Sequence, residues 1–157
     1  MAVSQETYID ISELEEVLLT RLEKFEKRIF SKALMTEIGN FAMTKIKVRT
    51  SEGKDVEGRY FKPYTAKYKM FRREKGLPTN VVDLFRTGSM LSSMTYDPYE
   101  RYVKIFFLNT SDEFNVKNPK KAFFLNQKRR FFALSKDEVD KIVNMCIDYY
   151  NNLLDNM

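Results

Sequence analysis

The side chains that most often carry chemistry in proteins are sparse in this sequence. Among its 157 residues there is no His, and Cys146 is the only cysteine. The absence of His removes the commonest general base, the Ser-His-Asp arrangement and most zinc or iron sites. Neither a G-x-x-x-x-G-K-S/T phosphate loop nor a G-x-G-x-x-G fingerprint occurs. We therefore expect no catalytic residue, no metal site and no cofactor.

One group of carboxylates is dense enough to be weighed as a magnesium site, which Asp and Glu alone can form. It consists of Asp137, Glu138 and Asp140, shortly after Ser135. Ser135 with Glu138 three residues later makes a capping box, and acidic residues stabilise the positive end of a helix. We therefore interpret the cluster as the start of a helix, and Cys146 as a small core residue. A metal-dependent nuclease is the less favoured alternative.

Positive charge is concentrated in two segments. Residues 45–75 hold eleven Lys and Arg against four Asp and Glu, and residues 117–130 hold six Lys and Arg with no acid. Because the whole chain carries only +5, the remainder is acidic, with a net charge of −8. Such asymmetry predicts one face for an acidic partner, either nucleic acid or another protein, and one acidic face. A pair of solvated loops is the alternative interpretation.

The N-terminal half is typical of helices separated by a loop. Residues 7–11 alternate in polarity like a short strand, and Ser12 with Glu15 forms a capping box. The apolar residues that follow recur at helical spacing and predict an amphipathic helix: Leu14, Leu18, Leu22, Phe25 and Ile29. A second stripe, rotated by one residue, predicts a break near Phe30–Ser31, with one continuous bent helix as the alternative: Phe30, Leu34, Ile38 and Phe41.

The rest of the chain predicts a loop, short helices, strands and a final helix. Residues 50–63 form a basic loop or hairpin, and Thr65 caps a short helix that ends at Gly76. Strands are expected near 94–96 and over 102–108, joined by a turn at Asp97-Pro98, and a further strand over 122–126. Residues 109–121 are expected as a loop. The final helix begins at Ser135 and carries the stripe Val139, Ile142, Val143, Cys146 and Tyr150.

This order predicts a single α+β domain over residues 1–157. An N-terminal pair of helices, or one long bent helix, and the C-terminal helix pack on a small antiparallel β-sheet beside a long basic loop. No apolar run approaches the roughly 20 residues of a membrane helix, and the first residues lack the features of a signal peptide. A lone Cys fits a reducing compartment. We expect a protein that is not secreted and has no membrane partner.

The central region carries a more distinctive combination of residues. A Gly-x-x-Phe-x-Pro-Tyr-Thr-x-x-Tyr-Lys stretch begins at Gly58, and a Leu-x-x-Thr-Gly stretch begins at Leu84. This combination resembles the phage virion morphogenesis proteins, namely the Mu G-like tail-completion proteins and related neck proteins. Gly58, Phe61, Pro63, Tyr64, Thr65, Tyr68, Lys69, Leu84, Thr87, Gly88 and Leu91 match that pattern, with Ser92 a candidate for its final serine.

The similarity covers most of residues 7–145, and it includes the Arg-x-Phe-type segment before the last helix, here starting at Arg129. One segment departs from the pattern. Many relatives carry Tyr-Ala and then His-x-x-Gly after the sheet strand, whereas this chain continues as Phe106-Phe107-Leu108-Asn109 without any His.

The resemblance implies a structural protein of the virion and no enzyme. Such proteins assemble in the host cytoplasm as a ring at the head–tail junction, six-fold like a tail tube or twelve-fold like a portal. The implied partners are other copies of the chain, head-completion or portal-side proteins, and tail terminator or tail tube proteins. DNA passes transiently through the channel of such a ring.

Within this scheme, residues 50–80 are expected to reach a neighbouring subunit or an adjoining ring. The expected ring-interface residues are Arg59, Phe61, Lys62, Tyr64, Lys67, Tyr68, Lys69, Arg72 and Arg73. Lys128, Arg129 and Arg130 are expected to face the channel or an adjoining ring. The structural motif comprises Gly58, Pro63, Leu84, Thr87 and Gly88. A nucleic-acid-binding module is the main alternative, because basic segments with interleaved aromatic residues suit phosphates and bases.

Overall fold

The computed structural model describes residues 31–156 of the chain. Its helices are α2 (Lys32–Ser51), α3 (Ala66–Glu74), α4 (Ser89–Ser92), α5 (Asn118–Lys128) and α6 (Lys136–Asp155), and its strands are β1 (Met94–Pro98) and β2 (Val103–Phe107). This α+β arrangement of helices on a small antiparallel sheet confirms the expected fold class. The strand expected over 7–11 and the helix expected after Ser12 lie outside the described residues.

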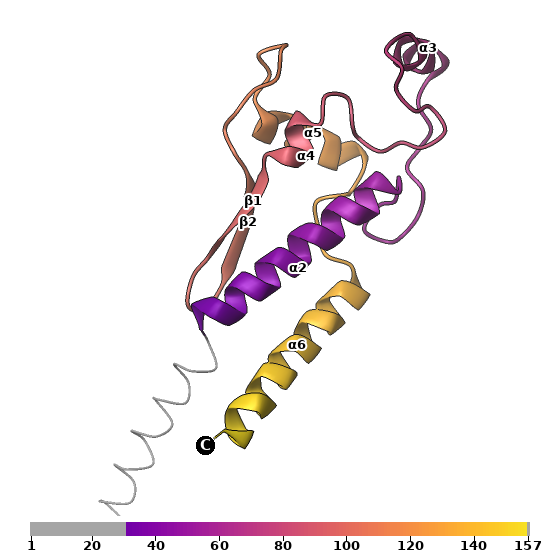
Figure 1. Cartoon of the computed structure of the whole chain (residues 1–157). Helices are drawn as coiled ribbons and strands as arrows, with labels where there is room; N and C mark the ends of the chain where they lie inside the picture. Colours follow the sequence, from indigo (N-terminus) through magenta and orange to yellow (C-terminus); the bar gives the residue numbers. More distant parts are fainter. Residues whose placement is uncertain (1–30, 157) are drawn as a thin grey trace, which may run out of the picture.

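Helix α2 is the central element of the body. Its cap is Ser31, whose backbone is extended and whose hydroxyl accepts the N–H of Leu34 at 3.1 Å. The predicted break near Phe30–Ser31 therefore coincides with the start of α2. The helix packs against the β-hairpin and, antiparallel, against α6 (Figure 1). Its buried face supplies both core clusters, with Leu34 and Ile38 toward α6 and Ile46 toward the larger cluster.

The β-hairpin pairs Met94 with Phe107 at one end and Pro98 with Val103 at the other. The two predicted strands are thus confirmed, but the predicted turn at Asp97-Pro98 is wrong. Both residues belong to β1, and the chain reverses over residues 99–102, where the Tyr99 N–H donates to the Tyr102 carbonyl at 2.9 Å. The rings of Tyr99 and Tyr102 stack 4.5 Å apart across this turn. Pro98 is tolerated there because it sits at the end of an edge strand.

The segment predicted as a strand over 122–126 is helical, and the loop predicted over 109–121 ends four residues early. Helix α5 begins at Asn118 with Pro119 in its first turn, a position that favours helix initiation. The wholly buried Asn118 amide donates to the Thr110 and Ser89 hydroxyls at 2.9 and 3.0 Å, which anchors the start of the helix. Ala122 then faces the core, so packing overrides the β-propensity of the Phe pair.

Helix α6 begins with the predicted capping box of Ser135 and Glu138. Only part of its predicted stripe is covered. Ile142 and Cys146 pack against α2, whereas Val139, Val143 and Tyr150 remain exposed. At the far end of the pair, the Ser31 and Tyr149 hydroxyls are hydrogen-bonded at 2.8 Å.

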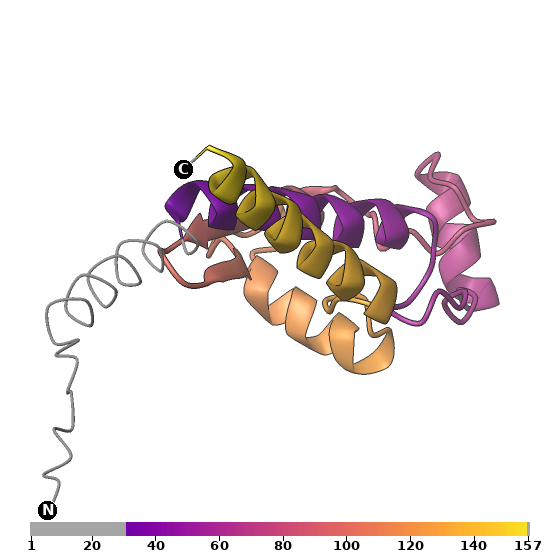
Figure 2. The same cartoon turned by 90° about the horizontal axis from the view of Figure 1, so that it is seen from below.

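The larger core lies between α2, the hairpin and α5. Phe131 is its most deeply buried aromatic residue, and the ring of Phe107 lies 6.3 Å from it. In the view from below, α6 lies in front of α2, and α5 lies beside the pair (Figure 2). Within residues 31–156, the helices are too short or too polar to cross a bilayer.

Gly39 of α2 is a packing requirement. A Cβ at this position would lie 2.5 Å from Tyr96 Cδ2 and 2.8 Å from Val103 Cγ2, so the helix approaches the hairpin too closely for any larger residue. We predict that Gly39→Ala lowers the free energy of unfolding by up to about 2 kcal/mol, because overpacking costs about 1–3 kcal/mol and the gain in helix propensity is about 1 kcal/mol. Urea denaturation measures this, with the exposed Asn40→Ala as a control. A stabilised Gly39→Ala protein would contradict the prediction.

Candidate interaction surface

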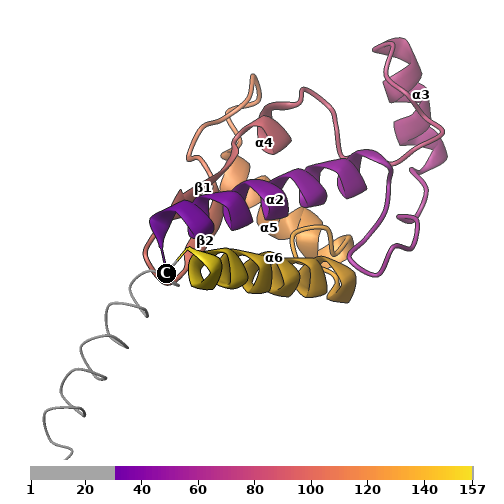
Figure 3. The ribbon, with the colours of Figure 1, turned by 60° about the horizontal axis from the view of Figure 1, so that its bottom comes forward.

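The most distinctive feature outside the core is a projecting segment, residues 62–81, which we call the arm. It contains α3 and stands apart from the other helices (Figures 1 and 3). Both of its ends are fixed, because Phe61 and Val82 are buried in the larger core at 6% and 7% exposure. Before the arm, Lys54 and Tyr60 form an antiparallel bridge that closes a small hairpin, in agreement with the predicted basic loop or hairpin. The arm is therefore an ordered projection from a rigid base.

Arg72 holds the arm in shape. Its side chain is fully buried, and its Nε and Nη1 donate to the Pro78 and Phe85 carbonyls at 2.6 and 2.7 Å. Its Nη2 pairs with Asp83 at 3.1 Å, and its guanidinium lies 4.6 Å from the centre of the Tyr64 ring. The sequence interpretation gave Arg72 to the ring interface. The structure corrects this, because every side of the group is already occupied within its own subunit.

Tyr64 completes this cluster of interactions around Arg72. Its hydroxyl donates to Asp83 at 3.3 Å, and burial raises the pKa of Tyr64 to about 12. The phenol therefore stays protonated at neutral pH and keeps its role as a donor. Phe61, also expected at the ring interface, lies in the core beside Tyr64 and is not accessible to a neighbour. Tyr64 and Phe61 thus attach the arm to the body.

The aromatic residues continue outward along α3. The ring of Tyr68 meets Tyr64 edge-on at 5.0 Å and stacks on Phe71 at 5.7 Å. Thr65 caps this helix as predicted, accepting the Tyr68 N–H at 3.3 Å. Met70 of the same helix is 61% exposed. It was not among the residues expected at the ring interface. The outer part of α3 therefore offers apolar as well as charged groups.

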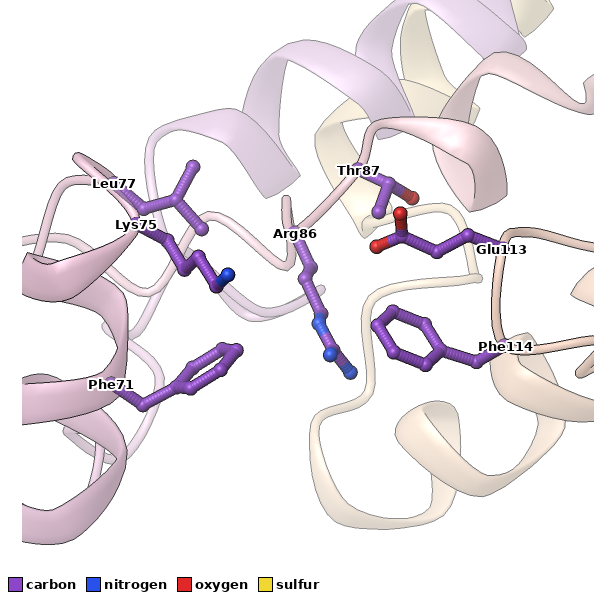
Figure 4. Close-up of a pocket in the computed structure, with 7 residues that line it drawn as sticks. All are labelled: Phe71, Lys75, Leu77, Arg86, Thr87, Glu113 and Phe114. Atoms are coloured by element: carbon purple, nitrogen blue, oxygen red, sulfur yellow. The ribbon is translucent and has the colours of Figure 1, made fainter.

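Arg86 links the arm to the loop before α5. Its guanidinium lies 5.2 Å from the centre of the Phe71 ring and 3.9 Å from that of Phe114, between the two aromatic side chains (Figure 4). Lys75, Leu77, Thr87 and Glu113 complete the lining of an open pocket around it. Sequence reasoning missed Arg86, although its position just before the Thr-Gly pair placed it beside the motif. The lining thus mixes aromatic and aliphatic side chains with two cations, one hydroxyl and one carboxylate, a composition that suits a contact surface.

The exposed positive charge of the arm comes from Lys62, Lys67 and Arg73, with Lys69 half-exposed and Lys75 exposed beside them. Within residues 31–156, no carboxylate forms a salt bridge with these five side chains. Arg59 differs, because it pairs with Asp55 and Glu57, each at 3.1 Å. Partial burial tends to raise the pKa of Asp55, but hydrogen bonds from Arg59 outweigh it and the pKa is lowered. Arg59 is therefore largely neutralised at the base of the arm.

The two basic segments, residues 45–75 and 117–130, are far apart in sequence but meet at the base of the arm. Arg130 pairs with Glu57 at 2.9 Å, and its carbonyl accepts the Val56 N–H at 2.9 Å. Arg129 donates to the Lys62 carbonyl at 3.4 Å and lies 5.9 Å from the centre of the Tyr64 ring. Lys128 is exposed at the end of α5. The residues expected at a channel thus adjoin the arm, and together they form one surface.

The motif residues shape the backbone around this surface. Gly58 and Gly88 both have φ of 76°, and Leu84 adopts a positive φ of 53° while packing on the core. A Cβ on Gly88 would lie 2.6 Å from Phe85 Cε2, so only Gly fits the corner before α4. The Thr87 hydroxyl accepts the Ser89 N–H at 3.4 Å in the same corner. Pro63 is exposed where the arm begins.

The described residues contain no group of three His, Cys, Asp or Glu side chains that could hold a metal ion. Glu138 is committed to Arg49, which donates to both of its oxygens. Burial raises the pKa of the Cys146 thiol, which leaves it protonated at neutral pH. Comparisons with protein-family models, with curated proteins and with solved structures give no match. Function is therefore inferred from this surface.

Proposed function

We propose that the chain is a structural protein of a tailed-phage particle, one subunit of a six- or twelve-fold ring at the head–tail junction. The observation that carries the proposal is the arm, an ordered projection with exposed positive charge. A segment that protrudes in this way buries little surface in its own subunit. The interactions of Arg72 nevertheless fix the direction in which the arm projects. A fixed direction favours a contact with another subunit, because little conformational entropy is lost on binding.

The distribution of charge supports a head-to-tail contact. Exposed carboxylates gather at the end of the body away from the arm, at the start of α2, the hairpin turn and the last turns of α6 (Figure 1). They are Glu37, Asp97, Glu100, Asp148 and Asp155, and they outnumber the exposed cations of the same region, Lys32, Arg101 and Lys104. A ring of identical subunits joins two different faces of each copy, and complementary charge on those faces sets the register. The neighbours above and below such a ring would be the head-completion or portal-side proteins and the tail proteins.

We predict that the purified chain forms a closed oligomer whose assembly depends on the arm. The double variant Lys67→Glu, Arg73→Glu reverses two exposed charges on α3 and is expected to shift the sample toward monomer. Light scattering with negative-stain imaging measures the mass and the shape. The control Lys117→Glu, Lys120→Glu changes net charge equally at the start of α5, outside the arm and the acidic end, and should assemble as the parent does.

The same sample separates this function from nucleic-acid binding, the second candidate. Lys62, Lys67, Arg73 and Lys128 could contact phosphates, and Tyr68 could stack on a base. A nucleic-acid-binding module would bind duplex or single-stranded DNA as an isolated chain, with a steep loss of affinity as salt rises. Fluorescence anisotropy at physiological salt is expected to show weak binding. Tight, salt-sensitive binding by a monomer would overturn the ring proposal.

A further inference from the structure

Helix α6 carries a second apolar stripe that the described residues leave exposed. Ile142, Met145, Cys146 and Tyr149 face α2, as a helix in a two-helix layer should. The neighbouring stripe faces solvent, with exposed fractions between 36% and 49%: Val139, Val143, Ile147, Tyr150 and Leu154. At 100° per residue these five side chains fall within about 80° of the helix surface. They form a continuous apolar line along almost the whole of α6, which we call the outer stripe.

The sequence holds one segment that matches the outer stripe in length and spacing. The apolar residues of the predicted helix after Ser12 are Leu14, Leu18, Leu22, Phe25 and Ile29. Their steps of four, four, three and four residues are the same as the steps from Val139 to Leu154. Two helices with apolar lines of equal length and period can pack along each other with their ridges in register.

We propose that residues 12–30 of a second copy of the chain pack as a helix along the outer stripe of α6. This inference rests on the proposed assembly and names one of its contacts. In a head-to-tail ring each copy then gives one helix and receives one, which closes without leaving any stripe exposed. The contact buries apolar surface, whereas the arm supplies charge.

The junction at Ser31 points to a second copy. Ser31 is held as the cap of α2 and is hydrogen-bonded to Tyr149 of α6. Because α2 runs antiparallel to α6, a helix that lay along its own α6 would have to reverse direction completely before α2. The predicted helix reaches Ile29, which leaves Phe30 as the one uncommitted residue, and antiparallel helices need a loop of about two to five residues. This short connection favours the α6 of a second copy as the partner in the proposed contact.

Disulfide trapping tests this contact. Leu22 and Ile147 occupy the third of the five positions from one end of their stripes, and they lie opposite each other whether the helices run parallel or antiparallel, to within one residue. A full-length chain with Leu22→Cys, carrying a size tag, is mixed with an untagged chain carrying Ile147→Cys, both with Cys146→Ala. Oxidation is expected to give the mixed dimer as the main product. The control replaces Leu22→Cys by Glu23→Cys, which lies on the opposite face of the predicted helix and should trap little.

Each result has a definite meaning. Trapping no stronger than in the Glu23→Cys control overturns the inference, as does a disulfide-linked dimer formed by the Ile147→Cys chain alone, which would show two α6 helices paired. A chain carrying both Leu22→Cys and Ile147→Cys that closes on itself as a monomer also overturns it. Light scattering on the same samples keeps the two proposals apart. An assembled ring without the mixed disulfide leaves the proposed function intact, whereas a chain that stays monomeric ends both.

Discussion

Replacing Arg49 by Met is expected to lower the free energy of unfolding by about 3–5 kcal/mol, the typical cost of breaking a buried ion pair. The Arg49 guanidinium donates to both oxygens of Glu138, and also to the carbonyls of Phe131 at 3.0 Å and Ala133 at 2.6 Å. Its removal leaves the Glu138 carboxylate buried without its cation and two carbonyls without their donor. Urea denaturation followed by circular dichroism measures the loss.

The matched control for Arg49 is Arg130→Met. Arg130 also pairs with a glutamate, Glu57, but both side chains are exposed, at 66% and 40%. An exposed pair contributes about 0–1 kcal/mol, so this variant should unfold almost as the parent does. The double variant Arg49→Met, Glu138→Met should recover part of the lost stability, because no charge is then left buried. Equal losses for Arg49→Met and Arg130→Met would show that burial of the pair is not what stabilises the chain.

Replacing Arg72 by Met is expected to open the arm while the body stays folded. The substitution removes the donors to Pro78 and Phe85 and leaves Asp83 without its buried partner. A loss of about 3 kcal/mol in the free energy of local opening corresponds to roughly a hundredfold faster amide exchange. Hydrogen exchange with mass spectrometry should show this acceleration over residues 62–85 and not in α2 or α6, because opening free energies differ between regions of one protein.

Arg73→Met is the control for Arg72. Arg73 is the next residue on the same helix but is exposed, so it should leave the exchange of the arm unchanged. The two variants remove the same charge and differ only in burial. Equal amide exchange rates in Arg72→Met and Arg73→Met would show that the interactions of Arg72 are not what orders the arm. Global unfolding of the Arg72→Met protein would equally show that the arm is not a separate unit.

Local signals in the sequence predicted the elements that local chemistry controls. Thr65 and Ser135 each cap a helix as predicted, because the hydroxyl accepts a free backbone N–H three residues later. Ser31 does the same for α2, where the sequence predicted only a break or bend. The hairpin followed from β-branched and aromatic residues over 102–108. The strand expected over 122–126 is wrong because the helix found there depends on contacts outside the local sequence. The anchor of α5 is Asn118, whose partners Ser89 and Thr110 are remote in sequence or lie in a loop, and no local pattern reveals them.

The sequence predicted which residue types form the candidate surface, but not which of their side chains are exposed. The sequence located the basic and aromatic residues of the arm, yet it could not tell that Arg72 points inward and Arg73 outward. The four-residue spacing of Arg72 from Tyr68 places the two side chains on the same face of α3, which was a usable signal. Arg49 likewise follows Ala42 and Ile46 at helical spacing on the buried face of α2. Its partner Glu138 lies 89 residues away, so only the fold identifies the pair.

The way the arm is attached determines what a salt titration of this protein reports. Its attachment depends on the pair of Arg72 and Asp83, in which Arg72 is fully buried and so shielded from dissolved ions. The exposed lysines of the arm have no such protection. Raising ionic strength should therefore weaken contacts between copies while each projection keeps its orientation, so subunits separated in concentrated salt are ready to reassociate on dilution without refolding.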